Sequence, residues 1–518
     1  MILKRTILAL GLALAVAGCK QEANPPQAAE ANEIAWREGD VDDALAEAKE
    51  LGKPVLLYWG AVWCPPCNQM KATLFKDPGF IAETQQFVPV YLDGDSKGAQ
   101  QWGERFGISG YPTVIVLQPD GTEITRISSA TMAGTLPGLL QAAAKSTTSI
   151  EALLAKAEAG TKGLTADDWR ILAGFDWRND PKHFDDLAKA GTLLERLSRG
   201  APDPAMKRRF AMLALVVSAD QDDDGNVVLT RAQQARLRQI LPPILASPEE
   251  TMANRQELMY DCGDLVAALS SAKQREALGQ SLTEAMDGLY ADESLSLAER
   301  LDAIYPSIAL AKANGGKVSP ELLARVRERV KWADDNAKDS TTRQAAMSDA
   351  ADLLDEAGDP EGAIALLEGE LKRSKAPYYY MLDLALIEEE QGDAKQAIGW
   401  ARRAYETSQG PATRVQWAVN YASLVMRMTP QDKPAVEASA VAVIDELAKS
   451  PDSYYQRTRV KVTKWGGKLR AWAEKNGGGE VLDRLRKEMA TVCATEGSEA
   501  DSCNQWSRAP QAPEGASG

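Results

Sequence analysis

A short apolar run followed by two closely spaced cysteines constrains the N-terminal part of this chain more than any other feature. Residues 55–59 read Val-Leu-Leu-Tyr-Trp, which is typical of a strand buried in a sheet that is covered on both faces. After a short loop come Cys64 and Cys67, and residues 69–74 have the pattern of the helix that these cysteines open. This order of strand, loop, cysteine pair and helix predicts a β/α unit with two sulfurs at a helix N-terminus.

The segments on either side of this unit predict a mixed sheet flanked by helices. A helix is expected over residues 41–51, because Asp40 is a suitable N-cap and Gly52 ends the apolar periodicity. Further strands are predicted at 87–92, 113–117 and 123–127, and further helices at 98–106 and 136–145. We therefore predict an α/β domain over residues 36–146.

The spacing of Cys64 and Cys67 suits thiol–disulfide exchange, which needs one thiolate to attack and a second thiol to resolve the mixed disulfide. Unpaired N–H groups at a helix start favour the thiolate, so Cys64 is the predicted nucleophile and Cys67 the resolving thiol. Pro65 and Pro66 stiffen the intervening dipeptide and lack N–H groups, so we expect them to tune the redox poise. On spacing alone, half a metal site or a static disulfide is an alternative. A metal site is disfavoured because His183 is the only histidine and no second C-x-x-C exists.

Residues 36–145 resemble the thioredoxin family, most closely the C-terminal domain of DsbD-type thiol:disulfide interchange proteins. Four runs carry the resemblance: Lys53-Pro54-Val55, Trp63-Cys64 with Cys67, Thr73-Leu74-Phe75-Lys76-Asp77-Pro78, and Gly110-Tyr111-Pro112-Thr113. The resemblance implies that Pro112 is a cis-proline beside the disulfide. It also implies that Trp63, Tyr111 and Pro112 bind an extended substrate segment by strand addition. A plain turn before a strand is the alternative for residues 110–112.

Two positions depart from the family pattern. The resemblance implies a buried Asp six residues before the first cysteine, where this chain has Tyr58. Val62 is likewise apolar where the DsbD domain has an acid. Because no carboxylate comes from the predicted active-site strand, proton transfer at the resolving thiol must use water or another group, or be slower. We therefore include Tyr58 with Pro65 and Pro66 among the residues that tune the site.

The first residues have the pattern of an export signal. Lys4 and Arg5 precede a short apolar stretch at 7–17, which predicts a signal peptide over residues 1–18. The run that ends at Cys19 resembles the lipobox of bacterial lipoproteins, which implies lipidation of Cys19 and an anchor in the periplasm of a Gram-negative bacterium. Lys20 is not the Asp that retains such proteins at the inner membrane, so the outer membrane is favoured. Ordinary cleavage with Cys19 as a stray thiol is the alternative, and residues 19–35 are predicted to be a flexible tether.

After residue 146 the strand signals end and helical patterns continue, which predicts an all-α region. Residues 357–364 recur at 391–398, and this offset of 34 residues resembles tetratricopeptide repeats. Gly358, Ala363, Gly392 and Ala397 occupy matching positions. Helices are predicted at 341–357, 360–373, 378–391, 394–407 and 412–426. We assign residues 147–335 to a helical region, either degenerate repeats or another helical array. Residues 336–506 are assigned to repeat-like and C-terminal helices, and residues 507–518 to a disordered tail.

The remaining cysteines and one acidic segment have structural interpretations. Cys493 and Cys503 are expected to form a structural disulfide, which an exported setting permits, and Cys262 to be a buried helix residue. Asp220, Asp222 and Asp224 match the first half of a calcium loop. The twelfth position of that loop is Arg231, which cannot bind Ca²⁺, so we favour an acidic turn followed by a capping box of Thr230 and Gln233. Calcium remains the weaker alternative.

Charge and composition restrict the function further. The formal net charge of −15 should repel nucleic acid. The leading hypothesis is an enzyme without a cofactor that exchanges disulfides in exported proteins, with the helices recruiting a partner protein. A DsbD-like membrane donor would supply electrons. The alternatives are a helical adaptor, whose thioredoxin-like unit serves only for docking, and a sensor of periplasmic redox state.

Overall fold

The computed structural model describes most of the chain from residue 33 to residue 507. The positions outside this description are 39, 97, 128–135, 181, 185, 224, 450–453, 495–502 and 504–505, together with 1–32 and 508–518. The predicted signal peptide, the lipidated Cys19, most of the tether, Asp224 and nearly all of the predicted tail therefore lie outside the described residues.

A five-stranded mixed sheet forms the centre of the N-terminal domain. Its strands are β1 (Arg37–Glu38), β2 (Val55–Gly60), β3 (Val88–Asp93), β4 (Thr113–Leu117) and β5 (Glu123–Ile127), in the order β1-β3-β2-β4-β5. Strands β1, β3 and β2 run parallel, whereas β4 and β5 are antiparallel additions. Leu57 of the central strand pairs with Val90 on one side and Ile115 on the other, so β2 is enclosed.

Helices cover both faces of this sheet, as the apolar run at 55–59 predicted. Val55, Leu57 and Trp59 point to the face covered by α1 (Val41–Leu51) and α4 (Ala99–Phe106). Leu56 and Tyr58 point to the opposite face, because successive residues of a strand alternate. That face is covered by α2 (Pro65–Ala72), α3 (Pro78–Thr84) and α5 (Leu136–Lys145). The predicted α/β class is confirmed.

Two local details differ from the predicted elements. Helix α2 begins at Pro65 rather than at residue 69, because prolines at the first helical positions have no intrahelical N–H bond to lose. It ends at Ala72, and a 3₁₀ turn (Leu74–Lys76) follows. Helix α3 was not predicted, although Asp77 caps it by accepting a hydrogen bond from the N–H of Phe80 (2.7 Å).

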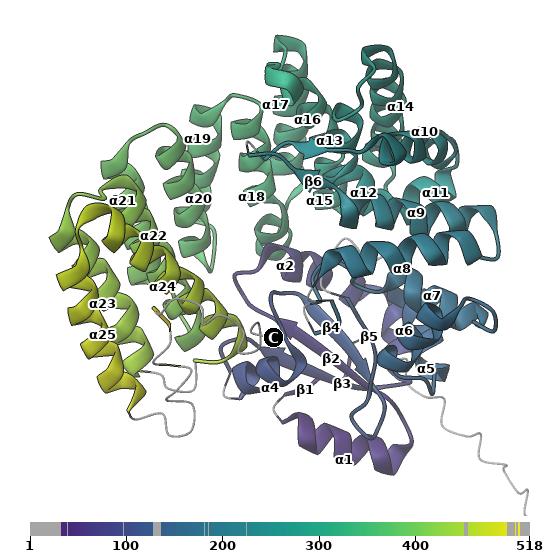
Figure 1. Ribbon diagram of the computed structural model, residues 1–518, viewed down its shortest axis with the longest axis horizontal. Coiled ribbons are helices and arrows are strands. Elements are labelled where there is room, and N and C mark those ends of the chain that lie inside the picture. Colours follow the sequence, from purple (N-terminus) through teal and green to yellow (C-terminus); the bar gives the residue numbers. More distant parts are fainter. Residues whose placement is uncertain are drawn as a thin grey trace, which may run out of the picture.

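The rest of the described chain is almost entirely helical and curves around the N-terminal domain (Figure 1). Its helices are α6 (Ile150–Ala159), α7 (Ala166–Gly174), α8 (Leu187–Gly200), α9 (Pro204–Ser218), α10 (Arg231–Leu245), α11 (Pro248–Ala253), α12 (Arg255–Tyr260), α13 (Cys262–Ala267), α14 (Ala272–Ala291), α15 (Leu297–Asp302), α16 (Tyr305–Lys312), α17 (Pro320–Asn336), α18 (Ser340–Glu356), α19 (Pro360–Glu370), α20 (Pro377–Glu390), α21 (Ala394–Thr407), α22 (Pro411–Met428), α23 (Lys433–Lys449), α24 (Gln456–Asn476) and α25 (Gly479–Cys493). Within the described part of the chain, none of the helices is both long and apolar enough to cross a membrane.

The predicted repeat is visible in two successive helix pairs, α18 with α19 and α20 with α21. Gly358 and Gly392 both adopt positive φ angles, of 90° and 79°, at the turn inside each pair. Ala363 and Ala397 are fully buried, which lets the paired helices approach closely. The predicted helical boundaries are thus confirmed to within a few residues, and this region is built from repeating helical pairs.

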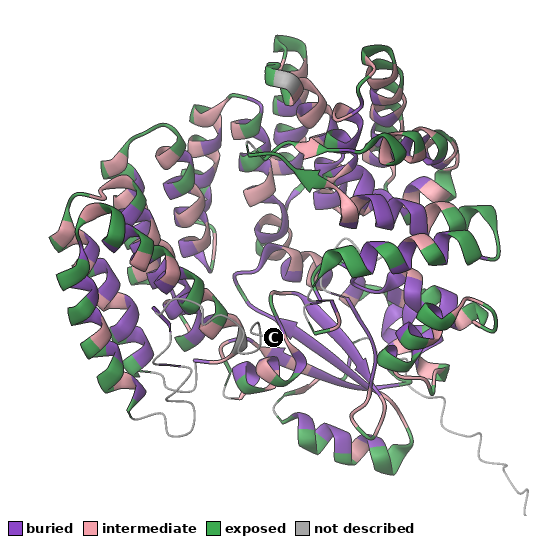
Figure 2. Ribbon diagram, viewed as in Figure 1, coloured by how far each residue is buried: buried purple, intermediate pink, exposed green. Residues whose placement is uncertain are grey.

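The hydrophobic core continues across residue 146, where we placed a domain boundary. Leu139 and Leu140 of α5 belong to one buried cluster with Phe175, Leu193 and Leu194 of the helical region. Figure 2 shows the buried faces of the helices turned toward the inside of the molecule. Helices α6 to α9 are therefore packed onto the sheet domain as part of the same core.

A buried ion cluster joins these helices to the sheet. Arg126 of β5 pairs with Glu123 (2.6 Å) and with Asp180 (3.3 Å), and all three side chains are almost fully buried. Arg126 also donates a hydrogen bond to the carbonyl oxygen of Phe106 (2.8 Å). Because each charge has partners, the cluster fixes the segment around Asp180 against the sheet.

The acidic segment at Asp220 is a small hairpin. Strands β6 (Asp220–Gln221) and β7 (Val227–Val228) pair where we expected only a turn, because Asp222 accepts the N–H of Asn226 (2.9 Å) and closes the connection. The predicted capping box of Thr230 and Gln233 begins α10.

The cysteines outside the C-x-x-C pair are all buried among the described residues. Cys262 lies in α13 with a free thiol, and burial raises its pKa well above the usual range. Cys493 and Cys503 form a disulfide beside α24 and α25.

Carboxyl groups on α18 and α20 should make stability depend on pH. Burial raises the pKa of Asp349 and of Asp383 to about 7 each, far above the value of an unfolded chain. Both groups therefore bind protons more tightly in the folded state, and their contribution is lost as the pH rises from about 4 through 7. We expect the free energy of unfolding, measured by chemical denaturation, to fall over this range. The Asp349→Asn/Asp383→Asn variant should show a flatter profile, and an unchanged slope would contradict this assignment.

Candidate active site

The cysteine pair lies where the central strand ends and α2 begins. Cys64 is the N-cap of α2, and its Sγ accepts the backbone N–H of Cys67 (3.1 Å). A disulfide joins the two residues. Their side chains are buried, with exposures of 1% for Cys64 and 0% for Cys67. The attacking and resolving positions predicted from the spacing are therefore adjacent at a helix N-terminus.

The two prolines limit how the helix can stabilise a thiolate at Cys64. Pro65 and Pro66 fill the first two helical positions, so the N–H of Cys67 is the first one that the helix offers. The helix dipole adds to this single hydrogen bond. Asn68 closes the turn by donating from its side-chain amide to the carbonyl oxygens of Val62 and Cys64, both at 3.0 Å.

The loop before β4 carries the other residues that the resemblance singled out. The peptide bond between Tyr111 and Pro112 is cis, and Pro112 is buried. The ring of Tyr111 lies beside that of Trp63, with ring centroids 6.3 Å apart. Gln100 donates a hydrogen bond to the hydroxyl oxygen of Tyr111 (3.1 Å). Trp63 and Tyr111 thus lie together next to the cysteine pair.

Tyr58 occupies an aromatic cluster under α2. It is 1% exposed, stacks on Tyr91 (5.5 Å between centroids) and meets Phe75 edge-on (4.9 Å). Its hydroxyl has no hydrogen-bond partner among the described residues, and burial raises its pKa well above the usual range. Tyr58 therefore cannot accept a proton from a thiol. Val62 is 58% exposed and supplies no acid, whereas Asp93 lies opposite Gly60 on the neighbouring strand.

The helical region covers the cysteine pair. Trp63 stacks on Tyr379 of α20 (6.0 Å between centroids) and meets Trp417 of α22 edge-on (5.0 Å). Its indole Nε1 donates a hydrogen bond to Oγ1 of Thr413 (2.8 Å), and its carbonyl oxygen accepts one from Gln344 of α18 (3.3 Å). One apolar cluster contains both cysteines together with Ala376, Tyr378, Met381, Ala404 and Trp417.

Thr413 connects this cover to a second loop of the sheet domain. Its backbone N–H donates to Asp95 (2.7 Å), and its hydroxyl donates to the other carboxylate oxygen. Gln69 of α2 adds a hydrogen bond to Ser296 (2.9 Å). Sequence reasoning missed Thr413, Trp417, Tyr379 and Gln344, because each contact joins residues that are hundreds of positions apart. The aromatic run Tyr378-Tyr379-Tyr380 in a predicted helix was the one local signal.

His183 lies outside this site. It contacts Asp180 and, at 3.2 Å, Glu151, and with Asp180 and Glu123 it forms a group close enough to hold a metal ion. Arg126 and Lys182 already pair with these carboxylates, so the charges are balanced by the protein itself.

Removing the side-chain hydrogen bonds of Thr413 should expose the disulfide. In the Thr413→Val variant, Trp63 loses its acceptor and Asp95 loses a donor, at a cost of about 1 kcal/mol for each bond. We expect dithiothreitol to reduce the Cys64–Cys67 disulfide up to about thirtyfold faster, as measured by thiol labelling over time. Thr429→Val at the other end of α22 is the matched control. Equal rates in all three proteins would show that the cover does not limit access.

Known proteins resemble the N-terminal domain. Residues 41–144 match the family model described as a thioredoxin-like domain. The thiol:disulfide interchange protein DsbD 1 of Pseudomonas aeruginosa is 34% identical over 85 residues, which are 16% of this chain and 14% of that protein. DsbD of Vibrio vulnificus is 29% identical over 106 residues, 20% of this chain and 17% of that protein.

Shorter proteins match over most of their length. An H-type thioredoxin of Oryza sativa subsp. indica is 28% identical over 92 residues, 18% of this chain and 70% of that protein. A solution structure of a thioredoxin from Thermus thermophilus shares 26% identity over 21% of this chain and 86% of that one, with a TM-score of 0.20. The DsbD relatives are thus matched over a small fraction of their length. Residues 41–144 are a thioredoxin-like domain.

Proposed function

We propose that this protein is a lipid-anchored thiol–disulfide oxidoreductase of the periplasm that exchanges disulfides in exported proteins. The observation that carries the proposal is the placement of Cys64 at the N-cap of α2, where its Sγ accepts the N–H of its disulfide partner Cys67. The lipobox-like run ending at Cys19 supports the location, and the Cys493–Cys503 disulfide suits an oxidising compartment.

The exchange proceeds in two steps, in which the enzyme dithiol is oxidised and the client disulfide is reduced. In the reduced enzyme, the thiolate of Cys64 attacks one sulfur of a client disulfide, which forms a mixed disulfide and releases the other client sulfur as a thiolate. The thiolate of Cys67 then attacks Sγ of Cys64, which releases the second client thiolate and forms the Cys64–Cys67 disulfide. Two electrons pass to the client, whose two thiolates take up protons from solvent.

The oxidised pair needs a dithiol donor to return to the reduced state. The relatives from Pseudomonas aeruginosa and Vibrio vulnificus are thiol:disulfide interchange proteins of the DsbD type, and a DsbD-like membrane protein is the donor that we propose. The extended client segment binds against a surface, here called the shelf, that is formed by Trp63, Tyr111 and Pro112. The repeating helical pairs recruit the client or another partner protein.

The cover over the cysteines favours a second candidate function. Because Cys64 is 1% exposed under α20 and α22, a client cannot reach it without movement of the helices. A redox sensor or docking module, in which the state of the disulfide controls the helical region, would use the same contacts with little turnover. Tyr58, which cannot accept a proton, also fits slow exchange.

A measurement of catalytic turnover distinguishes the oxidoreductase from the redox sensor or docking module. The full mature chain should reduce insulin disulfides in the presence of dithiothreitol, and Cys64→Ser should abolish this activity because the attacking sulfur is lost. The Cys67→Ala variant should keep clients bound to Cys64 as mixed disulfides, which gel electrophoresis without reductant would detect. Wild-type turnover no faster than that of Cys64→Ser would exclude the enzyme and favour the sensor.

The reduction potential of the pair gives the direction of exchange. We expect a value closer to the roughly −270 mV of thioredoxin than to the roughly −120 mV of a strong oxidant, because the proposed role is reductive. Equilibration of the full chain with glutathione buffers, followed by thiol counting, measures it. A value near the oxidant end would reverse the proposed direction without changing the chemistry.

A further inference from the structure

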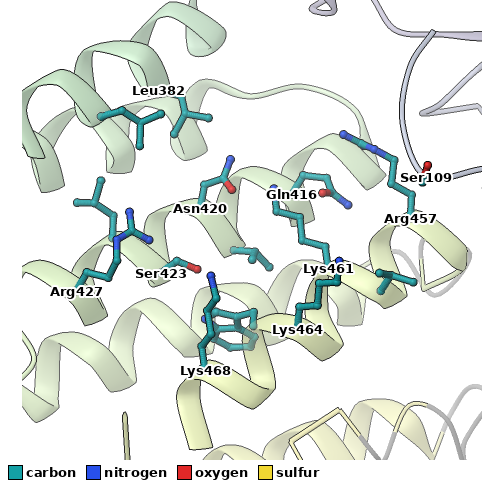
Figure 3. Close-up of a pocket in the computed structure, with 15 residues that line it drawn as sticks. Ser109, Leu382, Gln416, Asn420, Ser423, Arg427, Arg457, Lys461, Lys464 and Lys468 are labelled. Carbon is teal, nitrogen blue, oxygen red and sulfur yellow. The ribbon is translucent and has the colours of Figure 1, made fainter. Parts of the chain in front are cut away.

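A cavity beside the redox site gathers positive charge in an otherwise acidic chain. It has a volume of about 530 Å³ and lies between α20, α22 and α24 (Figure 3). Five basic residues line it, namely Arg427, Arg457, Lys461, Lys464 and Lys468, and none of the described residues that line it is acidic. The whole chain has a net charge of −15, so this concentration of cations opposes the general trend. Helix α24 has no Asp or Glu between residues 456 and 473.

The lysines of this cavity have no partners within the described part of the protein. Arg427 pairs with Glu389 (2.6 Å), but the ammonium groups of Lys461, Lys464 and Lys468 make no ion pair or hydrogen bond there. Burial, with the charges of Arg457 and Lys468, lowers the pKa of Lys461 to about 7. The positive charges of Arg457, Lys461 and Lys468 therefore repel one another more strongly than those of solvated surface lysines. An anion bound in the cavity would relieve this repulsion.

The shape of the cationic row suits an extended chain. Arg457, Lys461, Lys464 and Lys468 are spaced by four, three and four residues, so they share one face of α24 over about 16 Å. An extended peptide covers that length with about five residues, whereas a small dicarboxylate spans only part of it. Across the cavity, Gln416, Asn420 and Ser423 of α22 offer hydrogen-bonding groups, as Figure 3 shows.

Apolar residues and the redox loop complete the surroundings. Leu386 of α20 and Val460 of α24 also line the cavity and are exposed by 43% and 37%. The guanidinium of Arg457 lies over the rings of Trp63 (5.3 Å) and Tyr111 (4.8 Å), so one end of the cavity adjoins the redox site.

We propose that this cavity binds an extended acidic segment of a client polypeptide, with carboxylates on Lys461, Lys464 and Lys468 and apolar side chains against Leu386 and Val460. The segment would lead past Arg457 toward the shelf beside Cys64. The identification of the occupant as a client rests on the proposed function. Binding of the peptide itself does not require turnover.

The test is a fluorescence anisotropy titration of the full mature, oxidised chain with a labelled peptide of alternating Glu and Leu. We expect saturable binding that weakens with salt, and about tenfold weaker binding of the matched peptide with Gln in place of Glu. The Lys464→Gln/Lys468→Gln variant should lose about tenfold in affinity, and its two exposed positions remove no buried packing. Lys475→Gln/Lys487→Gln, exposed on α24 and α25, is the control and should bind as wild type.

Three outcomes would overturn the proposal. These are equal binding of the Gln peptide, unchanged affinity in the Lys464/Lys468 variant, and competitive binding of citrate that the Glu peptide cannot displace. The last result would assign the cavity to a small polycarboxylate. The Cys64→Ser variant should bind the peptide normally, because binding does not need the thiol. Failure of insulin turnover in the wild-type chain with retained peptide binding would therefore reject the oxidoreductase alone.

Discussion

Trp63 holds the redox loop against the helical region, and the accessibility of the cysteine pair depends on this contact. Its ring contacts both Tyr379 and Trp417, while its indole N–H and its carbonyl oxygen bond to Thr413 and Gln344. Aromatic contacts of this kind contribute beyond simple burial of area, and the two hydrogen bonds fix their geometry. The residue directly before Cys64 therefore controls both the position of the loop and its exposure.

Charges of opposite sign flank this contact. Tyr379 lies near Asp349 and Asp383, and burial together with these charges raises its pKa. On the other side, Arg457 lies over Trp63 and Tyr111 and continues into the lysines of α24. Oppositely charged groups on two sides of Trp63 would orient a partner with an uneven charge distribution. The net negative charge of the whole chain does not reveal this local separation of acidic and basic groups.

Patterns among neighbouring residues predicted most of the helices and strands, and they predicted the part of the site that lies in the N-terminal domain. The continuous apolar run at residues 55–59, the N-cap at Asp40 and the glycine turns at 358 and 392 depend on neighbouring residues only, so the sequence predicted the elements they form. The cysteine pair and the cis peptide before Pro112 followed from a local resemblance. Thr413 and Trp417 could not be found this way, because only the curvature of many helices brings them to Trp63. The core that crosses residue 146 was missed for the same reason.

The shared core of the sheet domain and α6 to α9 determines how the cover could move. Since Leu139 and Leu140 pack with Leu193 and Leu194, residue 146 cannot act as a hinge. The later helices form successive clusters, each containing sequence neighbours from the stack. In such a stack, small rotations between neighbouring helices add up to a large displacement at the far end of the stack. The helical region is therefore fixed to the sheet domain through α6 to α9, and any movement of α20 and α22 away from the cysteines would be shared among many helix pairs.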